Sequence, residues 1–308
     1  MVTVIRTDRR SAVLTPSSLA CLWHMPTINL TSGCAHGCLY CYMRGYTTHP
    51  GEDKIVIYGN TLEKLKDELA HKRTKPQAVY FSPSSELFQP VPEVLALGYR
   101  ILEFLFSMGI GVAFLSKGHI PDKTMRLLLN HADKVKAQIG IITLDEDILR
   151  MFEPNASSPS VRIKQIAMLI AGGIATEARL DPILPGFTDT PDALTHLFSA
   201  LAKVGVKRAV ASVLFLRPSV LESLKRNVHN KEVLQELLGF YRDAKRLAIR
   251  AERSCVIALP RATRDEIYTR VRHFAEKHAV DLSICACKNP DLAHGTCNIG
   301  GNWPLAQY

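Results

Sequence analysis

Strand and helix signals alternate along most of the chain, and this alternation limits the fold more than any other feature. Apolar runs such as AVYFSP (78–83) and GVAFLSK (111–117) predict buried strands, and a segment with helical periodicity follows each. About six strand–helix units lie between residues 26 and 216. Repeated units of this kind are typical of a parallel sheet, so we expect an α/β fold with one barrel-type domain or two smaller domains.

The expected elements follow from these runs. Strands are expected at 26–30, 78–83, 111–117, 135–143, 175–184, 206–216 and 255–260. Helices are expected at 61–72, 91–108, 121–131, 145–152, 159–171, 191–204 and 263–279. We expect an irregular N-terminal extension (1–25), the βα region (26–216), and a helical, then Cys-rich C-terminal region (217–308) packed on it. Within the last region, 218–250 reads as charged helix and the tail from Ser283 as a loop organised by its cysteines.

Composition excludes few classes of function. Hydrophobic residues make up 47% of the 308 residues and charged residues 22%, which is typical of a soluble globular protein. No apolar run is long enough to span a membrane, and the start lacks a signal peptide's apolar stretch, so a cytoplasmic protein is expected. The net charge of +9 is compatible with a nucleic acid as partner and equally with a solvated basic surface, because the basic residues are scattered.

Three of the eight cysteines, Cys34, Cys38 and Cys41, form a CxxxCxxC loop directly after the first expected strand. Clustered cysteines in a chain without a secretory signal indicate metal ligation rather than disulfides. Three thiolates on one loop can bind three irons of a cubane cluster and leave the fourth iron open for a ligand. The alternative is a zinc site with His36 or a distant residue as fourth ligand, although zinc sites more often use paired CxxC spacing.

At these residues the sequence resembles the radical S-adenosylmethionine (SAM) superfamily, whose motif CxxxCxΦC places an aromatic residue where Tyr40 stands. The resemblance implies a partial (β/α)6 TIM-type barrel and a 4Fe-4S cluster at Cys34, Cys38 and Cys41. It also implies that SAM chelates the open iron and is cleaved reductively to methionine and a 5′-deoxyadenosyl radical. That radical abstracts a hydrogen atom from the substrate.

Further segments resemble the spore photoproduct lyase-like branch of this superfamily. In chain order they read INLTSGCAHGCLYCYMR, SPSSELFQPVPE, FLSKG, FEPNASSPSVRIKQI and AGGIATEARLDPILPGFTD. Spore photoproduct lyases carry a hydrogen-donor cysteine in the loop after the second strand, whereas SPSSELFQP contains none. The resemblance therefore carries over the scaffold and the SAM chemistry, and leaves the substrate and the class of reaction (lyase, oxidoreductase or transferase) open.

The family places its SAM contacts at strand ends, and four polar residues stand there. Glu86 is a candidate to accept hydrogen bonds from the SAM amino group; the alternative is that it is an ordinary exposed carboxylate of the loop. Lys117, next to Ser116, is a candidate partner for the SAM carboxylate; the alternative is that it is an ordinary solvated lysine at a strand end. Thr143 is a candidate ribose contact, although threonine in a strand needs no function.

Arg179 lies within an otherwise apolar strand, so its guanidinium requires an anionic partner. The SAM carboxylate and Asp181 are the two candidates. Tyr40 and Tyr42 are candidates to flank the adenine or to shield the cluster, and ordinary packing is the alternative.

Cys285, Cys287 and Cys297 form a second group near the C-terminus. They could bind a second iron–sulfur cluster or a zinc ion, with His294, Cys255 or a substrate as fourth ligand. The alternatives are free or redox-active thiols, one of which could donate a hydrogen atom to a product radical. Cys21 and Cys255 lie in apolar surroundings and are expected in the core.

The sequence thus predicts a radical SAM enzyme that works with a reductant such as flavodoxin or ferredoxin. A nucleic acid or nucleotide is the weakly favoured substrate, because of the branch resemblance and the positive charge; the target base of a duplex would have to be flipped out. A peptide or small metabolite is the main rival. A zinc-stabilised nucleic-acid-binding protein and a two-cluster electron-transfer protein are the non-catalytic alternatives.

Overall fold

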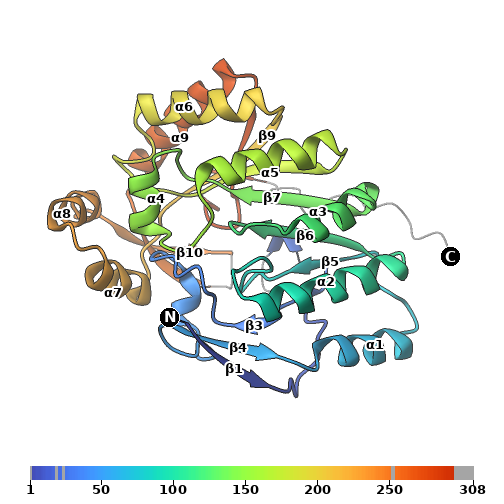
Figure 1. Cartoon of the computed structure of the whole chain (residues 1–308). Coiled ribbons are helices and arrows are strands. Elements are labelled where there is room, and N and C mark those ends of the chain that lie inside the picture. Colours follow the sequence, from blue (N-terminus) through green and yellow to red (C-terminus); the bar gives the residue numbers. More distant parts are fainter. Residues whose placement is uncertain (1, 18–19, 23–24, 251–253, 295–308) are drawn as a thin grey trace.

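A seven-stranded, wholly parallel sheet forms the centre of the computed structural model (Figure 1), which describes residues 2–17, 20–22, 25–250 and 254–294. The strand order is β12-β9-β8-β7-β6-β5-β2, and each neighbouring pair is parallel. The strands are β2 (Thr27–Ile28), β5 (Ala78–Phe81), β6 (Gly111–Ser116), β7 (Val135–Gly140), β8 (Ala175–Ile183), β9 (Arg208–Val213) and β12 (Asp281–Ile284).

Helices cover the outer face of this curved sheet. They are α1 (Thr61–His71), α2 (Pro92–Ser107), α3 (Asp122–Leu129), α5 (Pro159–Ala171), α6 (Pro191–Lys203) and α9 (Arg261–Lys277). The sequence sets their starts: the side chains of Ser158 and Thr190 cap α5 and α6, and a proline follows each cap. Strand β5 is buried at every position, as expected for a parallel strand that packs on both faces. The predicted α/β fold, a partial TIM-type barrel, is confirmed.

The N-terminal part differs from the prediction. Residues 1–25 were expected to be irregular, but β1 (Thr3–Thr7) pairs in parallel with β4 (Lys54–Tyr58), which also pairs with β3 (Thr31–Ser32). Because β1 is largely exposed, it carries no buried apolar pattern that would have revealed it. Of the expected strand at 26–30, only Thr27–Ile28 (β2) is a strand of the barrel, and the following β3 pairs with β4 outside the barrel sheet.

The C-terminal region also differs. The expected helix at 218–250 contains α7 (Pro218–Asn227) and α8 (Lys231–Gly239), but Lys245–Ile249 is a strand, β10. β10 pairs antiparallel with β11 (Ser254–Ala258), and this pairing overrides the helical appearance of a Lys- and Arg-rich segment. β12 adds a seventh strand beside β9, where a loop was expected. The division of the chain at residue 216 remains a prediction.

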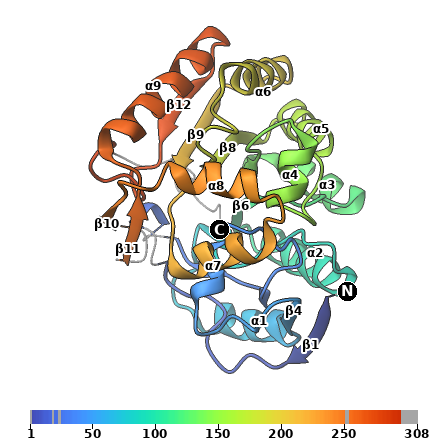
Figure 2. The same cartoon turned by 90° about the vertical axis from the view of Figure 1, so that its left-hand side faces the viewer.

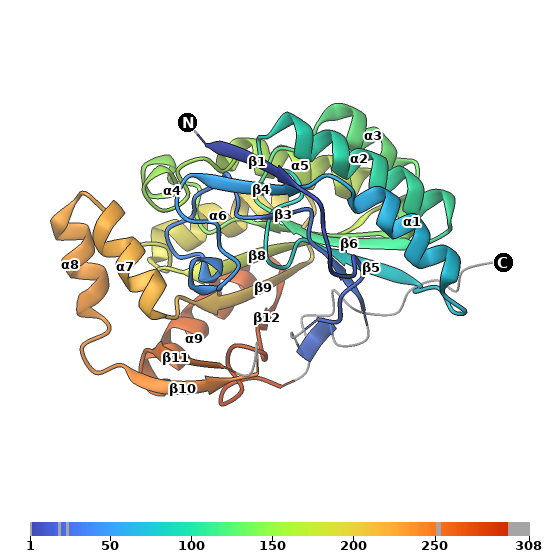
Figure 3. The same cartoon turned by 90° about the horizontal axis from the view of Figure 1, so that it is seen from below.

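The carboxyl ends of the strands face α7, α8 and α4 (Glu146–Phe152), on the left in Figure 1 and toward the viewer in Figure 2. Parallel barrels carry their functional sites at this end. The β10–β11 hairpin lies along one side of it, as Figure 3 shows from below. In the described residues we find no helix that is both long and apolar enough to cross a membrane.

Candidate active site

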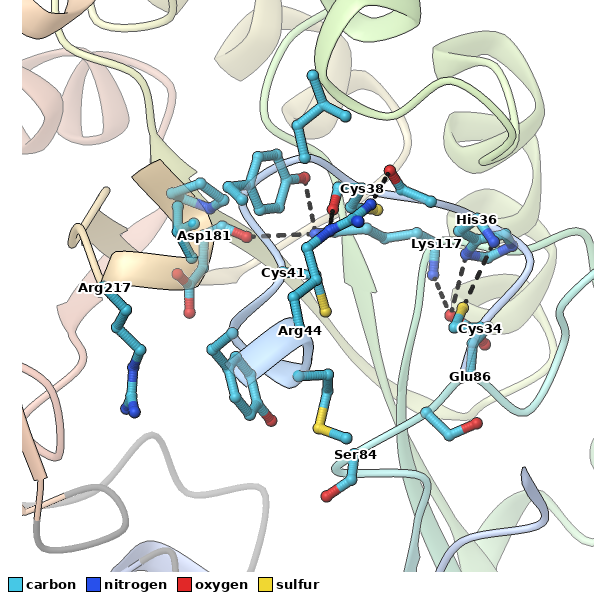
Figure 4. A pocket seen from close by; sticks show the side chains of 18 of the residues that line it. Cys34, His36, Cys38, Cys41, Arg44, Ser84, Glu86, Lys117, Asp181 and Arg217 are labelled. Atoms are coloured by element: carbon cyan, nitrogen blue, oxygen red, sulfur yellow. Dashed lines mark hydrogen bonds and ion pairs between the residues drawn. The ribbon is translucent and has the colours of Figure 1, made fainter. Parts of the chain in front are cut away.

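The predicted cysteine loop opens into a cavity of about 910 Å³ at the carboxyl ends of the strands. Cys34, Cys38 and Cys41 all line this cavity, and their thiols form no disulfide (Figure 4). The loop follows β3 of the small β1-β4-β3 sheet, whereas the sequence placed it directly after the first strand of the barrel. The structure therefore brings the three candidate cluster ligands together at one wall of a cavity large enough for a cofactor and a substrate.

Local backbone geometry fixes the start of the loop. Gly33 has φ +82°, and a Cβ atom there would lie 2.4 Å from the carbonyl oxygen of Lys54 on β4. Only glycine satisfies both the positive φ and this close approach. At the other end, Arg44 donates from Nε to the Cys38 carbonyl (3.2 Å) and from Nη2 to the Gly37 carbonyl (2.9 Å).

The thiols fit an iron–sulfur cluster. Burial raises the pKa of Cys34 well above its usual value, that of Cys38 to about 12, and that of Cys41. The thiolates that ligate iron are therefore unfavourable here unless a cation neutralises them, and cluster iron would supply that cation. His36 also lines the cavity; burial, and next the charges of Arg162 and Lys117, lower its pKa to about 3, so it is neutral.

Glu86 is buried and is not the exposed loop carboxylate of the alternative interpretation. Its Oε1 accepts hydrogen bonds from the amide of Phe88 (2.9 Å) and the hydroxyl of Ser116 (2.8 Å), and its Oε2 accepts from the amide of Lys117 (3.0 Å). Glu86 lines the cavity, where Nδ1 of His36 lies 3.7 Å from its Oε2, and a carboxylate can accept roughly four hydrogen bonds in all. The carboxylate also ties the loop after β5 to the end of β6.

Lys117 and Tyr40 meet beside the cysteine loop. The Lys117 ammonium donates to the Tyr40 hydroxyl (2.8 Å) and lies 4.6 Å from the centroid of the Tyr40 ring. The Tyr40 hydroxyl in turn donates to Glu153, which pairs with Arg162. Burial lowers the pKa of Lys117. Sequence reasoning missed Glu153 and Arg162 as site residues, although both stand in the FEPNASSPSVRIKQI segment.

Arg179 pairs with Asp181, the second of the two partners considered for it. Its Nη2 donates a hydrogen bond to Oδ2 of Asp181 (2.8 Å), and the same oxygen accepts a hydrogen bond from the Lys288 ammonium (2.8 Å). Burial alone would raise the pKa of Asp181, but the charges of Lys288 and Arg179 outweigh it and lower that pKa. Arg179 lines the cavity, so its predicted contact with SAM remains a prediction.

Two predicted SAM contacts lie apart from the cavity lining. Ser116 is buried and bridges Glu86 to the amide of Gly118 (2.9 Å). Thr143 is buried, and its hydroxyl accepts the amide of Asp145 (3.0 Å) at the start of α4. In this conformation both residues support the site from behind.

The C-terminal cysteines separate into different environments. Cys285 and Cys287 are buried and line the same cavity as the first three cysteines. Cys297 lies outside the described residues. Cys255 is exposed, which corrects its expected place in the core: on β11 the side chains of Val256 and Ala258 point inward, so Cys255 points out. Cys21 is half-buried and lines the cavity with Cys285 and Cys287.

The sequence model of the radical SAM superfamily matches residues 28–198, which include the cysteine loop and the strands β5 to β8. The chain belongs to the radical SAM superfamily. Membership implies a 4Fe-4S cluster and SAM as cofactors, and the donor set at Cys34, Cys38 and Cys41 agrees with this. Radical SAM enzymes in general need an electron donor.

The curated relatives span a broad range of organisms. An uncharacterized protein of Mycobacterium tuberculosis is 26% identical over 221 residues, which cover 68% of this chain and 64% of that protein. A radical SAM Nalpha-GlyT isomerase of Pseudomonas phage M6 is 31% identical over 173 residues, 56% of this chain and 35% of that one. The chain thus spans less than two thirds of the length of these relatives.

Among solved structures, spore photoproduct lyase with bound AdoMet and dinucleoside spore photoproduct has the same fold. The TM-score is 0.66 at 16% identity, and the superposition covers 92% of this chain and 81% of that one. At this identity the likeness extends to the fold alone, and it confirms the predicted structural resemblance to that branch.

Proposed function

We propose that this chain is a radical SAM enzyme that cleaves SAM reductively and abstracts a hydrogen atom from a nucleic acid or nucleotide. The observation that carries the proposal is the opening of the family's cysteine loop into a single large cavity. When bound at Cys34, Cys38 and Cys41, the cluster supplies the electron that cleaves SAM into methionine and the 5′-deoxyadenosyl radical. A flavodoxin- or ferredoxin-like protein is the proposed reductant.

The residues around the cavity have distinct proposed roles. Lys117 is held by Tyr40 and Glu153 and would pair with the SAM carboxylate; Glu86 would accept a hydrogen bond from the SAM amino group. Tyr40 would shield the cluster and position Lys117. Ser116 would act through Glu86, and Thr143 through the start of α4.

Charge around the cavity supports an anionic substrate. Its lining includes the basic side chains Lys54, Arg150, Arg217 and Arg226, in addition to Arg44 and Lys288, which pair with the lining carboxylates of Glu52 and Asp181. Arg217 lies on the side opposite Glu86 (Figure 4), near the ring of Tyr42. A phosphate backbone fits such a lining, and an aromatic side chain can stack on an exposed base. The dinucleoside bound in the spore photoproduct lyase structure agrees with this substrate class.

Deuterium transfer tests the proposal. The reduced enzyme is incubated with SAM and either fully deuterated oligonucleotides or a deuterated peptide pool, and 5′-deoxyadenosine is analysed by mass spectrometry. Deuterium acquired from DNA or RNA supports the proposal, whereas deuterium acquired only from peptides moves the substrate to that class.

Binding provides an independent control. Oligonucleotide affinity should fall steeply between about 50 and 200 mM salt, because phosphate contacts release counterions. Arg217→Gln should weaken binding, and Arg261→Gln, exposed at the start of α9 and outside the cavity lining, should not. Binding that is absent at low salt would contradict the nucleic-acid assignment while leaving SAM cleavage untouched.

A further inference from the structure

Three cysteine thiols from the two ends of the chain meet on the cavity wall. Cys21 belongs to the short 3₁₀ helix Ala20–Leu22, and Cys285 and Cys287 follow β12. All three side chains belong to one packed cluster, in which the Cys287 thiol interacts with those of Cys21 and Cys285. Figure 3 shows the blue N-terminal segment and the red C-terminal loop approaching each other below the sheet. All three cysteines line the cavity that contains the radical SAM loop.

The loop that presents Cys285 and Cys287 is firmly held. The amide side chain of Asn289 is fully buried; its Oδ1 accepts from Arg264 (3.1 Å) and from the Tyr268 hydroxyl (2.8 Å). Its Nδ2 donates to the Cys285 carbonyl (3.1 Å). Such a network fixes a backbone conformation before any ligand binds, as a ligand site requires.

The surroundings suit an anionic, thiolate-bound group. The thiols pack against apolar side chains that include Leu22, Met25 and Tyr80. Nη2 of Arg179 lies 3.6 Å from the sulfur of Cys285, so a cation stands beside the thiols. A cluster with thiolate ligands carries net negative charge, which this guanidinium would stabilise within an apolar wall.

We propose that Cys21, Cys285 and Cys287 bind a second iron–sulfur cluster. This ligand set differs from the one expected from the sequence, because Cys21 was expected to be a core residue and is now assigned to the site. The CxC spacing differs from the paired CxxC of most zinc sites. Among the described residues no three Cys, His, Asp or Glu side chains close around a single ion, and that also holds for Cys34, Cys38 and Cys41.

The test isolates the second site by removing the first. The full-length variant Cys34→Ala/Cys38→Ala/Cys41→Ala is reconstituted anaerobically, and iron, sulfide and zinc are quantified. We expect this variant to retain iron and sulfide in equal amounts, and to lose most of both when Cys21→Ala is added. Adding Cys255→Ala, an exposed cysteine on β11, should leave both unchanged. Circular dichroism and thermal unfolding establish that each variant is folded.

A second measurement uses the unmodified protein and so does not depend on the folding of variants. In Mössbauer spectra of wild type, SAM should perturb the signal of one cluster and leave that of the other unchanged. The proposal would be overturned if the protein bound zinc in place of iron and sulfide, or if Cys21→Ala left the iron content unchanged. Loss of SAM cleavage alone would not, because that reaction belongs to the first cluster.

Discussion

Glu153 and Arg162 form an ion pair directly behind the cysteine loop, and both side chains are 0% exposed. Arg162 also donates to the carbonyls of Ser157 (2.9 Å) and Gly140 (2.8 Å), at the end of β7. The other oxygen of Glu153 accepts the Tyr40 hydroxyl, so the pair connects the barrel to the loop between Cys38 and Cys41. A buried carboxylate thus holds the residue that marks the family motif.

Glu153→Gln should destabilise the protein strongly. The change leaves the Arg162 guanidinium buried without its counter-charge, which typically costs about 3 kcal/mol or more. Urea unfolding under reducing conditions measures the loss, and Glu146→Gln, exposed on α4, is the matched control. A loss no larger than that of the control would show that the pair does not stabilise the fold.

Tyr40 and Glu153 should be energetically coupled. In a double-mutant cycle of Tyr40→Phe and Glu153→Gln, the double variant should be more stable than additive losses predict, by about 1 kcal/mol. The reason is that Tyr40→Phe removes the hydrogen bond to Glu153, and Glu153→Gln weakens that same bond because it removes the charge of the acceptor. Additivity within error would mean that the hydroxyl and the carboxylate act independently.

Gly33→Ala should reduce cluster loading several-fold. Gly33 and Gly51 both have positive φ, so alanine at either position introduces backbone strain of about 1 kcal/mol. Only at Gly33 would the new Cβ also collide with the carbonyl of Lys54; at Gly51 nothing lies within 4 Å. Iron content after reconstitution should therefore fall for Gly33→Ala and stay near wild type for Gly51→Ala.

Asp181 should make stability depend on pH. Its folded-state pKa lies below the ordinary value of 3.8, because the charges of Lys288 and Arg179 outweigh burial. The contribution of the carboxylate is therefore fully present above about pH 4 and is lost as the pH falls below that value. Asp181→Asn should cost most at neutral pH and progressively less in acid, as measured by urea unfolding. Asp67→Asn, exposed on α1, should show no such trend.

The sequence predicts those parts of the fold that rest on local pattern. Buried strands such as β5 and β6 are continuous apolar runs, and the caps Ser158 and Thr190 mark helix starts. The exposed strand β1 was missed because its partner β4 lies far along the chain (Thr3 pairs with Lys54), and a local pattern does not contain that partner. The exposed strand β10 pairs with the adjacent β11 and was missed because its Lys- and Arg-rich segment resembles a helix.

The residues of the candidate site were likewise predictable only where a local pattern marks them. The cysteine loop and Lys117 were predicted because a spacing motif and a strand end mark them. Glu153 reads as an ordinary polar residue between two helices, and only the fold places it under Tyr40. Cys21 was assigned to the core because nothing in its neighbourhood indicates the C-terminal cysteines that it meets.

The central claim is that the loop of Cys34, Cys38 and Cys41 supports reductive cleavage of SAM. The most direct measurement is 5′-deoxyadenosine released anaerobically after dithionite is added to reconstituted wild type, Cys38→Ala and Cys255→Ala. We predict product from wild type and Cys255→Ala and none from Cys38→Ala. A wild-type protein that carries its full iron and sulfide yet releases no 5′-deoxyadenosine would contradict the claim.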